Sequence, residues 1–198
     1  AGNRMACCDP FRITVEGSST HGSTPHLGTD AIVAAASIIM NIQTYVSRNN
    51  DPLNPLVVTV GKIDGGQRFN ILANKVVMEG TCRTFSRKTL ETIDKDLERI
   101  AANTAAAFGA SASLEYQHLT TPVINDHADL NRIARNAVIK LYGEEGLGHL
   151  PTMMGSEDFA FFMEEVPGIF GFIGSRDPEQ GYIYTNHHEK YSVHKQVL

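Results

Sequence analysis

Three residues of this sequence stand in patterns that suit substrate binding or acid–base chemistry. His21 lies in the Gly- and Ser-rich segment GSSTHGSTPH, and loops held by a rigid scaffold often carry function. Asn70 follows a Gly-rich turn, and Arg83 lies on the polar side of an alternating segment, where a guanidinium fork suits a carboxylate. Each pattern also has a purely structural interpretation. His21 and Asn70 could belong to solvated turns. Arg83 could pair with Glu79 on the same strand face.

The adjacent histidines His187 and His188 raise the question of a metal site. Either imidazole could bind an ion from a loop, with Glu189 or Asp177 as an oxygen ligand or as a partner of the imidazole. The spacing of these residues does not by itself form a complete zinc site. The sequence contains no GxSxG, P-loop or GxGxxG motif, which argues against a serine-hydrolase elbow, a phosphate-binding loop and a dinucleotide site.

Composition narrows the class of protein. The 198 residues include 22 acidic and 17 basic side chains, with a net charge of −5, which argues against a nucleic-acid partner. At 42% hydrophobic residues the chain can build a core. No apolar run approaches the roughly 18 residues of a membrane span, and we expect no membrane partner and a cytoplasmic location. Cys7, Cys8 and Cys82 form no CxxC pair and are expected to be reduced thiols.

The elements that must position these residues follow from hydrophobic periodicity. Alternation predicts strands over 11–17, 56–63, 75–85 and 112–119. Helical spacing predicts helices over 30–47 and 88–108, the first burying the face of Ile32, Ala35, Ala36, Ile39, Ile42 and Val46. Asp30 or Thr29 can cap the first helix, Ser86 can cap the second, and Gly109 can end it. The order strand, helix, strand, strand, helix, strand predicts a ferredoxin-like sandwich of the α+β type, with both helices on one face of an antiparallel sheet.

The remaining sequence has a different texture. Helical patterns cover 129–142 and the segment GSEDFAFFMEEV, and the Gly-bounded run GIFGFIG at 168–174 predicts a buried strand. These elements supply too little apolar surface for an independent core. We therefore expect the residues after Thr121 and Pro122 to be part of a domain rather than a complete one.

Five segments, taken in order, resemble the M20 metallopeptidase family. They are DPFRITVEGSSTHGSTPHLGTDAIVAA, VSRNNDPLNPLVVTVGKIDGGQRFNIL, EGTCRTF, MGSEDFAFFMEEVPG and NHHEKY. Within the family the resemblance is to amidohydrolases of N-acyl amino acids, such as hippurate hydrolase and plant auxin-conjugate hydrolases. It implies a ferredoxin-like lid and dimerisation domain at 9–120, inserted into a zinc-peptidase α/β catalytic domain. Residues 1–8 would then be the connector from the catalytic domain, and 121–198 its C-terminal portion.

The resemblance also implies roles for individual residues. His21 is similar to the lid histidine that reaches a neighbouring active site and stabilises the carbonyl oxygen. Asn70 and Arg83 resemble the lid groups that bind the carboxylate end of the substrate. His187 resembles the last metal ligand, with His188 as the alternative.

The implied reaction is hydrolysis of the amide bond of N-acyl amino acids or small peptides by a metal-activated water. It implies two divalent ions, zinc or else manganese, cobalt or nickel, in the complete enzyme, and a homodimer formed through the lid. This chain begins where the lid begins, so we expect it to lack the other metal ligands and, alone, to bind no metal and be inactive. The sequence also departs locally, with NILAN where relatives read Asn-x-Ile-Pro-Asp and no proline after the histidine pair. The alternative hypothesis is a non-catalytic module for dimerisation or carboxylate binding.

Overall fold

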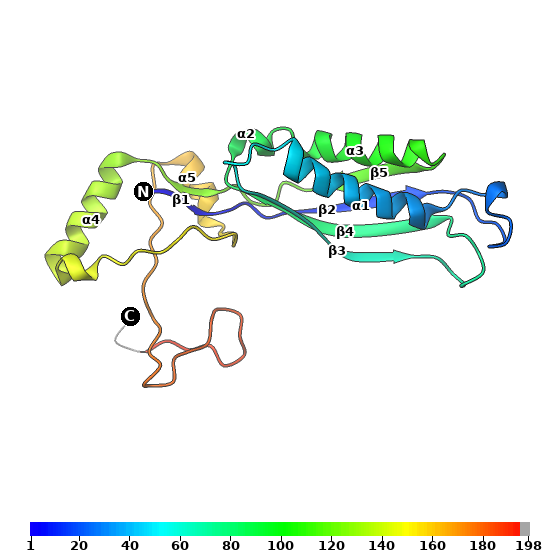
Figure 1. Cartoon of the computed structure of the whole chain (residues 1–198). Coiled ribbons are helices and arrows are strands. Elements are labelled where there is room, and N and C mark those ends of the chain that lie inside the picture. Colours follow the sequence, from blue (N-terminus) through cyan, green and yellow to red (C-terminus); the bar gives the residue numbers. More distant parts are fainter. Residues whose placement is uncertain (195–198) are drawn as a thin grey trace.

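The computed structural model describes residues 1–194, and its largest element is a four-stranded antiparallel sheet in the order β3–β4–β2–β5 (Figure 1). The strands are β2 Asp9–Glu16, β3 Leu56–Gly65, β4 Lys75–Thr84 and β5 Ser111–Tyr116. The two strands that are central in space, β2 and β4, are the first and third in chain order. This is the order of a split βαβ sandwich, so the predicted ferredoxin-like fold is confirmed.

The core of this unit lies between the sheet and two helices on one of its faces, α1 Ala31–Arg48 and α3 Ile93–Ala107 (Figure 1). Alternation along the strands supplies the apolar side, because every second side chain of a strand points to the same face. In β2 these are Phe11, Ile13 and Val15, all buried. The opposite face of the sheet carries polar side chains.

The predicted buried face of α1 is confirmed in part. Ala35 and Ile42 are fully buried, and Ile39 and Val46 pack partly buried against the core, but the prediction is wrong at Ile32 and Ala36. The buried residues are Ala31, Ala34, Ala35, Ile38 and Ile42, whereas Ile32 is 46% exposed. Apolar residues surround most of this helix, so periodicity alone does not decide which stripe faces the sheet. The N-terminus is as expected, because the Asp30 carboxylate caps it by accepting the N–H groups of residues 32 and 33.

The second predicted helix is divided in two. A short helix α2, Arg87–Leu90, begins at Ser86, whose hydroxyl accepts the Thr89 N–H. The chain leaves helical geometry at Thr92 before α3 begins. The helix stop is as expected, because Gly109 has φ +73°, a conformation that glycine adopts without strain.

The second unit is formed by both ends of the chain. Strand β1, Gly2–Met5, pairs antiparallel with β6, Val123–Asn125, and helices α4 Ala128–Tyr142 and α5 Phe159–Glu165 follow. Short 3-10 turns lie at Pro25–Leu27 and Glu144–Gly146. Residues 175–194 extend away from both units without a helix or strand (Figure 1). Residues 195–198 of the expected unit 121–198 lie outside the described residues.

The predicted buried strand over 168–174 does not form. Its backbone is held at one point by Asn125, whose side-chain amide donates to Phe170 O over 2.8 Å and accepts from Phe170 N over 2.9 Å. Apolar side chains nearby are also uncovered, with Phe172 at 41% and Ile173 at 76% exposure. A strand requires a neighbouring backbone along its length, and none of residues 1–194 pairs with this segment.

Candidate functional site

His21 lies at the tip of a closed loop that joins β2 to α1. The base of the loop is fixed by Ser18 and Thr29, which exchange backbone hydrogen bonds of 2.9 and 3.0 Å. Gly17 permits this closure, since a Cβ at position 17 would lie only 2.2 Å from the carbonyl oxygen of Thr29. The glycines and threonines of this segment therefore hold the histidine in place.

The imidazole of His21 is oriented by its own turn. The Thr24 N–H donates to His21 O over 2.9 Å, which closes a turn with Ser23 beside Nδ1 of the ring. The Ser23 N–H donates to Nδ1 over 3.1 Å, and Ser23 Oγ lies 2.7 Å from the same atom. A backbone N–H can only donate, so Nδ1 accepts and the proton of the neutral ring is on Nε2. His21 is exposed and can present this N–H to a ligand.

Asn70 lies beside His21. The segment that carries it runs along the His21 loop, with Gly22 N–H donating to Asn70 O over 2.8 Å and Leu72 N–H donating to Thr20 O over 2.9 Å. A Cβ at Gly22 would lie 3.2 Å from the Asn70 carbonyl oxygen, which makes glycine the residue that allows this close approach. The structure thus brings together two of the predicted site residues, contributed by two loops at one end of the sheet.

Arg83 lies at the opposite end of the sheet, near the junction with the second unit. Its Nη1 donates to the carbonyl oxygen of Met154 over 2.8 Å, which uses one of the five N–H donors of a guanidinium. The alternative pairing with Glu79 is wrong. Glu79 is bound by Arg12 at 3.2 Å and by Lys62 at 3.5 Å, both across neighbouring strands.

The separation of these groups is set by strand geometry. The loops of His21 and Asn70 lie at the end of the sheet where β4 begins, since Glu16 pairs with Lys75. Arg83 is one residue from the other end of β4. Ten residues of antiparallel strand span about 30 Å at about 3.4 Å each. One small substrate cannot contact both ends of β4 in a single chain.

The two histidines near the C-terminus differ in geometry. His187 has φ 69°, the only positive φ outside glycine among residues 1–194, and such backbone strain is concentrated at functional sites. His188 Nδ1 accepts the Lys190 N–H over 3.1 Å, and its ring is stacked on Tyr184 at 4.3 Å. The neutral His188 ring therefore carries its proton on Nε2, which leaves no lone pair there for a metal.

No complete metal site is assembled within residues 1–194. The described residues contain no cluster of three or more His, Cys, Asp or Glu side chains suited to an ion. Asp177, a possible oxygen ligand in the sequence, instead accepts the N–H groups of Glu179 and Gln180. His187 lies in the segment 175–194, which has no helix or strand and extends away from the four-stranded sheet (Figure 1). Within residues 1–194, these side chains therefore do not hold an ion in a three-ligand site of their own.

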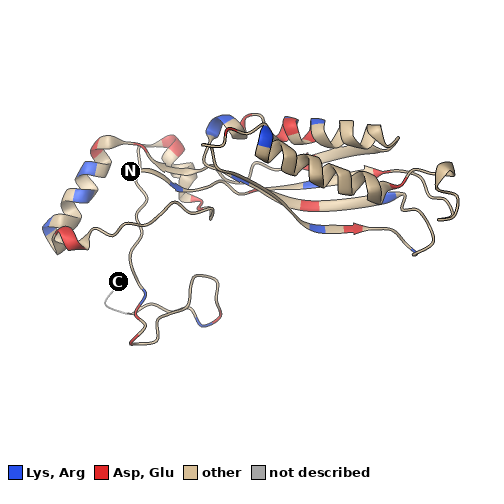
Figure 2. Cartoon of the chain, in the orientation of Figure 1, with Lys and Arg blue, Asp and Glu red and all other residues tan. Residues whose placement is uncertain are grey.

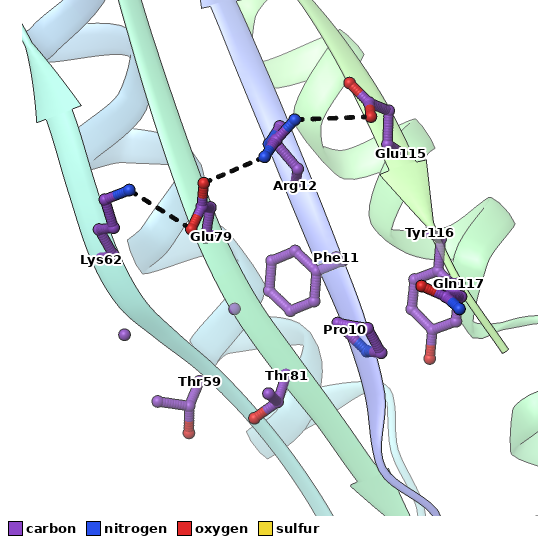
Figure 3. A pocket seen from close by; sticks show the side chains of 12 residues that line it. Pro10, Phe11, Arg12, Thr59, Lys62, Glu79, Thr81, Glu115, Tyr116 and Gln117 are labelled. Carbon is purple, nitrogen blue, oxygen red and sulfur yellow. Dashed lines mark hydrogen bonds and ion pairs between the residues drawn. The ribbon is translucent and has the colours of Figure 1, made fainter. Parts of the chain in front are cut away.

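A hollow of about 720 Å³ lies over the polar face of the sheet (Figure 3). A row of alternating charges crosses it in the order Lys62, Glu79, Arg12 and Glu115, each paired with the next at 3.2–3.9 Å. Because these charges neutralise one another, the hollow offers no excess charge to a ligand. None of the predicted site residues lines it.

A buried carboxylate, not singled out in the sequence, joins the two chain segments that link the units. Asp9 is fully buried and accepts the Tyr116 O–H over 3.0 Å and the N–H groups of Leu119 and Thr120 over 2.9 and 3.4 Å. Desolvation by burial raises the pKa of the Tyr116 hydroxyl far above its usual value, so it stays a donor. The sequence signal for Asp9 was its position two residues before Phe11, in phase with the inward side chains of that strand.

Ser23 was also missed, although a serine two residues after a histidine allows a local hydrogen bond.

Among helices in residues 1–194, none has the length and apolarity needed to cross a bilayer.

Comparison with known proteins places this geometry in a family. Residues 10–108 match the family model described as the M20 peptidase dimerisation domain. The chain is 36% identical over 174 residues to the N-acetyl-L-cysteine deacetylase of Bacillus subtilis, covering 88% of this chain and 41% of that protein. The curated relatives that it matches are about twice its length, with the chain spanning 41–50% of each.

Solved structures give the same result. A putative aminohydrolase from methicillin-resistant Staphylococcus aureus superposes with a TM-score of 0.80 at 32% identity, over 99% of this chain and 50% of that one. The YXEP protein of Bacillus subtilis, described as a dinuclear metal-binding peptidase of the M20 family, superposes with a TM-score of 0.76 at 26% identity, over 99% of this chain and 47% of that one. The chain therefore belongs to the M20 peptidase family and contains the dimerisation domain of that family.

Proposed function

We propose that this chain is part of a homodimeric, metal-dependent amidohydrolase that cleaves N-acyl amino acids or small peptides, and that each active site uses residues from both copies. The observation that carries the proposal is the separation of His21 and Asn70 from Arg83 along the ten residues of β4. Two ends of one strand can serve a common site only when the site is shared between two chains.

A two-fold axis beside β3 would supply this arrangement. Strand β3 is an edge strand, and an unpaired edge is a template for another chain. Pairing of β3 with its two-fold copy is antiparallel and isologous. The loop end of one sheet then lies against the Arg83 end of the other. His21 and Asn70 of one copy and Arg83 of its partner meet in this geometry, twice per dimer.

The surface next to the β3 edge favours this assembly. Helix α1 carries no charged residue before Arg48, as its uncoloured ribbon in Figure 2 shows. Its side chains Ile32, Val33 and Met40 are 46–67% exposed, and Ile63 of β3 is 53% exposed. A groove of about 390 Å³ runs between α1 and β3. Burial of these side chains between two copies would remove apolar surface from water, which drives association.

Each residue then has a role that fits its position. His21 would donate its Nε2–H to the oxygen of the scissile carbonyl as negative charge develops there. Asn70 and Arg83 would bind the carboxylate of the amino acid, Arg83 with a charge-assisted hydrogen bond. His187, in preference to His188, would supply one metal ligand. A pair of divalent ions, zinc or else manganese, cobalt or nickel, would lower the pKa of a bound water in the complete enzyme.

The test is complementation between inactive copies of a full-length protein that carries this sequence. His21→Ala and Arg83→Ala are expressed together with different affinity tags, and the mixed dimer is purified through both. Each site takes its His21 loop from one copy and its Arg83 from the other. In the mixed dimer, one site therefore lacks both His21 and Arg83, and the other site has both. We expect about half of the wild-type rate of N-acetyl amino acid hydrolysis.

The matched control is the mixed dimer of His21→Ala and Asn70→Ala. Both residues lie in the same pair of loops, so each site of this dimer lacks one group and no recovery is expected. A His21→Ala and Arg83→Ala dimer that is no more active than its parents would contradict shared sites. Full activity of His21→Ala alone would contradict the catalytic role of the histidine.

The proposal also covers the 198-residue chain alone. We propose that residues 9–120 are the lid, that 1–8 connect it to the catalytic domain, and that 121–198 belong to that domain. The isolated chain is expected to dimerise without hydrolysing amides or holding a metal, because His187 cannot fix an ion alone. The free thiols Cys7, Cys8 and Cys82 fit a reducing cytoplasm, which we include in the proposal.

A further inference from the structure

We propose that Ser23 is a positioning residue that holds the imidazole of His21 in its Nε2–H tautomer. Two polar atoms of Ser23 meet one ring atom, the backbone N at 3.1 Å and Oγ at 2.7 Å from Nδ1. The N–H fixes Nδ1 as an acceptor. With Nδ1 unprotonated, the shorter contact is a donation from the hydroxyl, so both groups favour the same tautomer.

The backbone around Ser23 makes this contact independent of packing. The turn is closed by the Thr24 N–H on His21 O at 2.9 Å, and the Thr24 hydroxyl donates to the same carbonyl over 3.2 Å. Ser23 itself is exposed. Its side chain therefore contributes little to the core, and its replacement should leave the fold intact.

This inference rests on the proposed function and adds a requirement to it. An Nε2–H that points away from the loop is a hydrogen-bond donor for a carbonyl oxygen, whereas the Nδ1–H tautomer would place a lone pair there and repel the developing charge. The orienting group of a catalytic imidazole is often a carboxylate, which would favour the opposite tautomer by accepting from Nδ1. A hydroxyl and an amide at Nδ1 produce the tautomer that an electrophilic histidine needs.

The tautomer can be measured directly in the 198-residue chain. Histidine labelled with ¹⁵N gives long-range ¹H–¹⁵N spectra that distinguish the two ring nitrogens, recorded at a pH where the ring is neutral. We expect Nε2–H for His21 in the wild type. In Ser23→Ala the ratio of Nε2–H to Nδ1–H should fall roughly two- to tenfold, the worth of one neutral hydrogen bond. Ser23→Thr, which keeps the hydroxyl, should restore the ratio.

Two comparisons make the result specific. Ser113→Ala changes an exposed serine of β5 and should leave the His21 spectrum unchanged. His188, whose Nδ1 also accepts a backbone N–H, is an internal reference for the Nε2–H pattern. A wild-type His21 in the Nδ1–H form, or an unchanged ratio in Ser23→Ala, would overturn the proposal.

The same variants separate this inference from the proposed function. In the full-length enzyme, Ser23→Ala should lower kcat in proportion to the measured fall in the fraction of His21 rings in the Nε2–H form and leave KM nearly unchanged. If the spectrum changes as expected but His21→Ala retains full activity, the positioning role stands and the catalytic role of His21 fails. If His21→Ala is inactive and the spectrum of Ser23→Ala is unchanged, the reverse holds.

Discussion

Replacement of Asp9 by alanine tests how the sheet is tied to the rest of the chain. The carboxylate is fully buried and receives hydrogen bonds from Tyr116, Leu119 and Thr120. The Cys8 N–H also donates to Thr120 Oγ1 over 2.7 Å. The segments that enter and leave the four-stranded sheet are thus joined through the side chain of Asp9, which is the first residue of β2.

The expected loss of stability follows from the donors left without an acceptor. A buried donor without a partner costs about 1–3 kcal/mol. Leu119 is 45% exposed, so water can reach its neighbourhood, and we count the Tyr116 hydroxyl and one amide as lasting losses. The free energy of unfolding should then fall by about 2–6 kcal/mol in Asp9→Ala. Asp9→Asn keeps one oxygen for the two amides and should cost about 1–2 kcal/mol.

Urea unfolding followed by circular dichroism measures both variants against the wild type. The control is Asp64→Ala, which removes an exposed carboxylate of β3 and should change the free energy of unfolding by no more than about 0.5 kcal/mol. An Asp9→Ala midpoint equal to that of Asp64→Ala would refute the reasoning, since it would mean that the buried carboxylate contributes no more than a surface one.

Two further predictions concern the dimer surface and the thiols. Met40→Asp places a charge on the 67% exposed apolar side of α1 and should shift the chain from dimer to monomer in light scattering, whereas Ser113→Asp on the other edge should not. A dimer that persists in Met40→Asp would refute the α1 interface. Burial raises the pKa of Cys7 from 9.0 to about 12, so the stability that this thiol contributes is complete below pH 9 and is lost as the pH rises toward 12. Thermal unfolding should show this alkaline decline, and Cys7→Ala should make it shallower; an identical decline would refute it.

The sequence alone determined the fold of the unit with the four-stranded sheet and the identity of the candidate residues. Alternation in segments such as 11–17 has a period of two, which fixes both the strand and its buried face without knowledge of its neighbours. The capping residues Asp30 and Ser86 and the stop at Gly109 act through the local backbone, so they too were readable. The residue types at positions 21, 70, 83 and 187 are likewise properties of the sequence.

Tertiary structure decided what the patterns left open. The buried stripe of α1 depends on which side meets the sheet, and segment 168–174 lacks a backbone partner among residues 1–194. Burial of Asp9 and the pairing of Arg83 with Met154 O join residues more than 70 positions apart, which no local pattern encodes. Above all, the separation of His21 from Arg83 depends on the direction in which β4 runs across the sheet. Contacts within a few residues are set by the local chain, whereas the position of a site is set by how distant segments pack together.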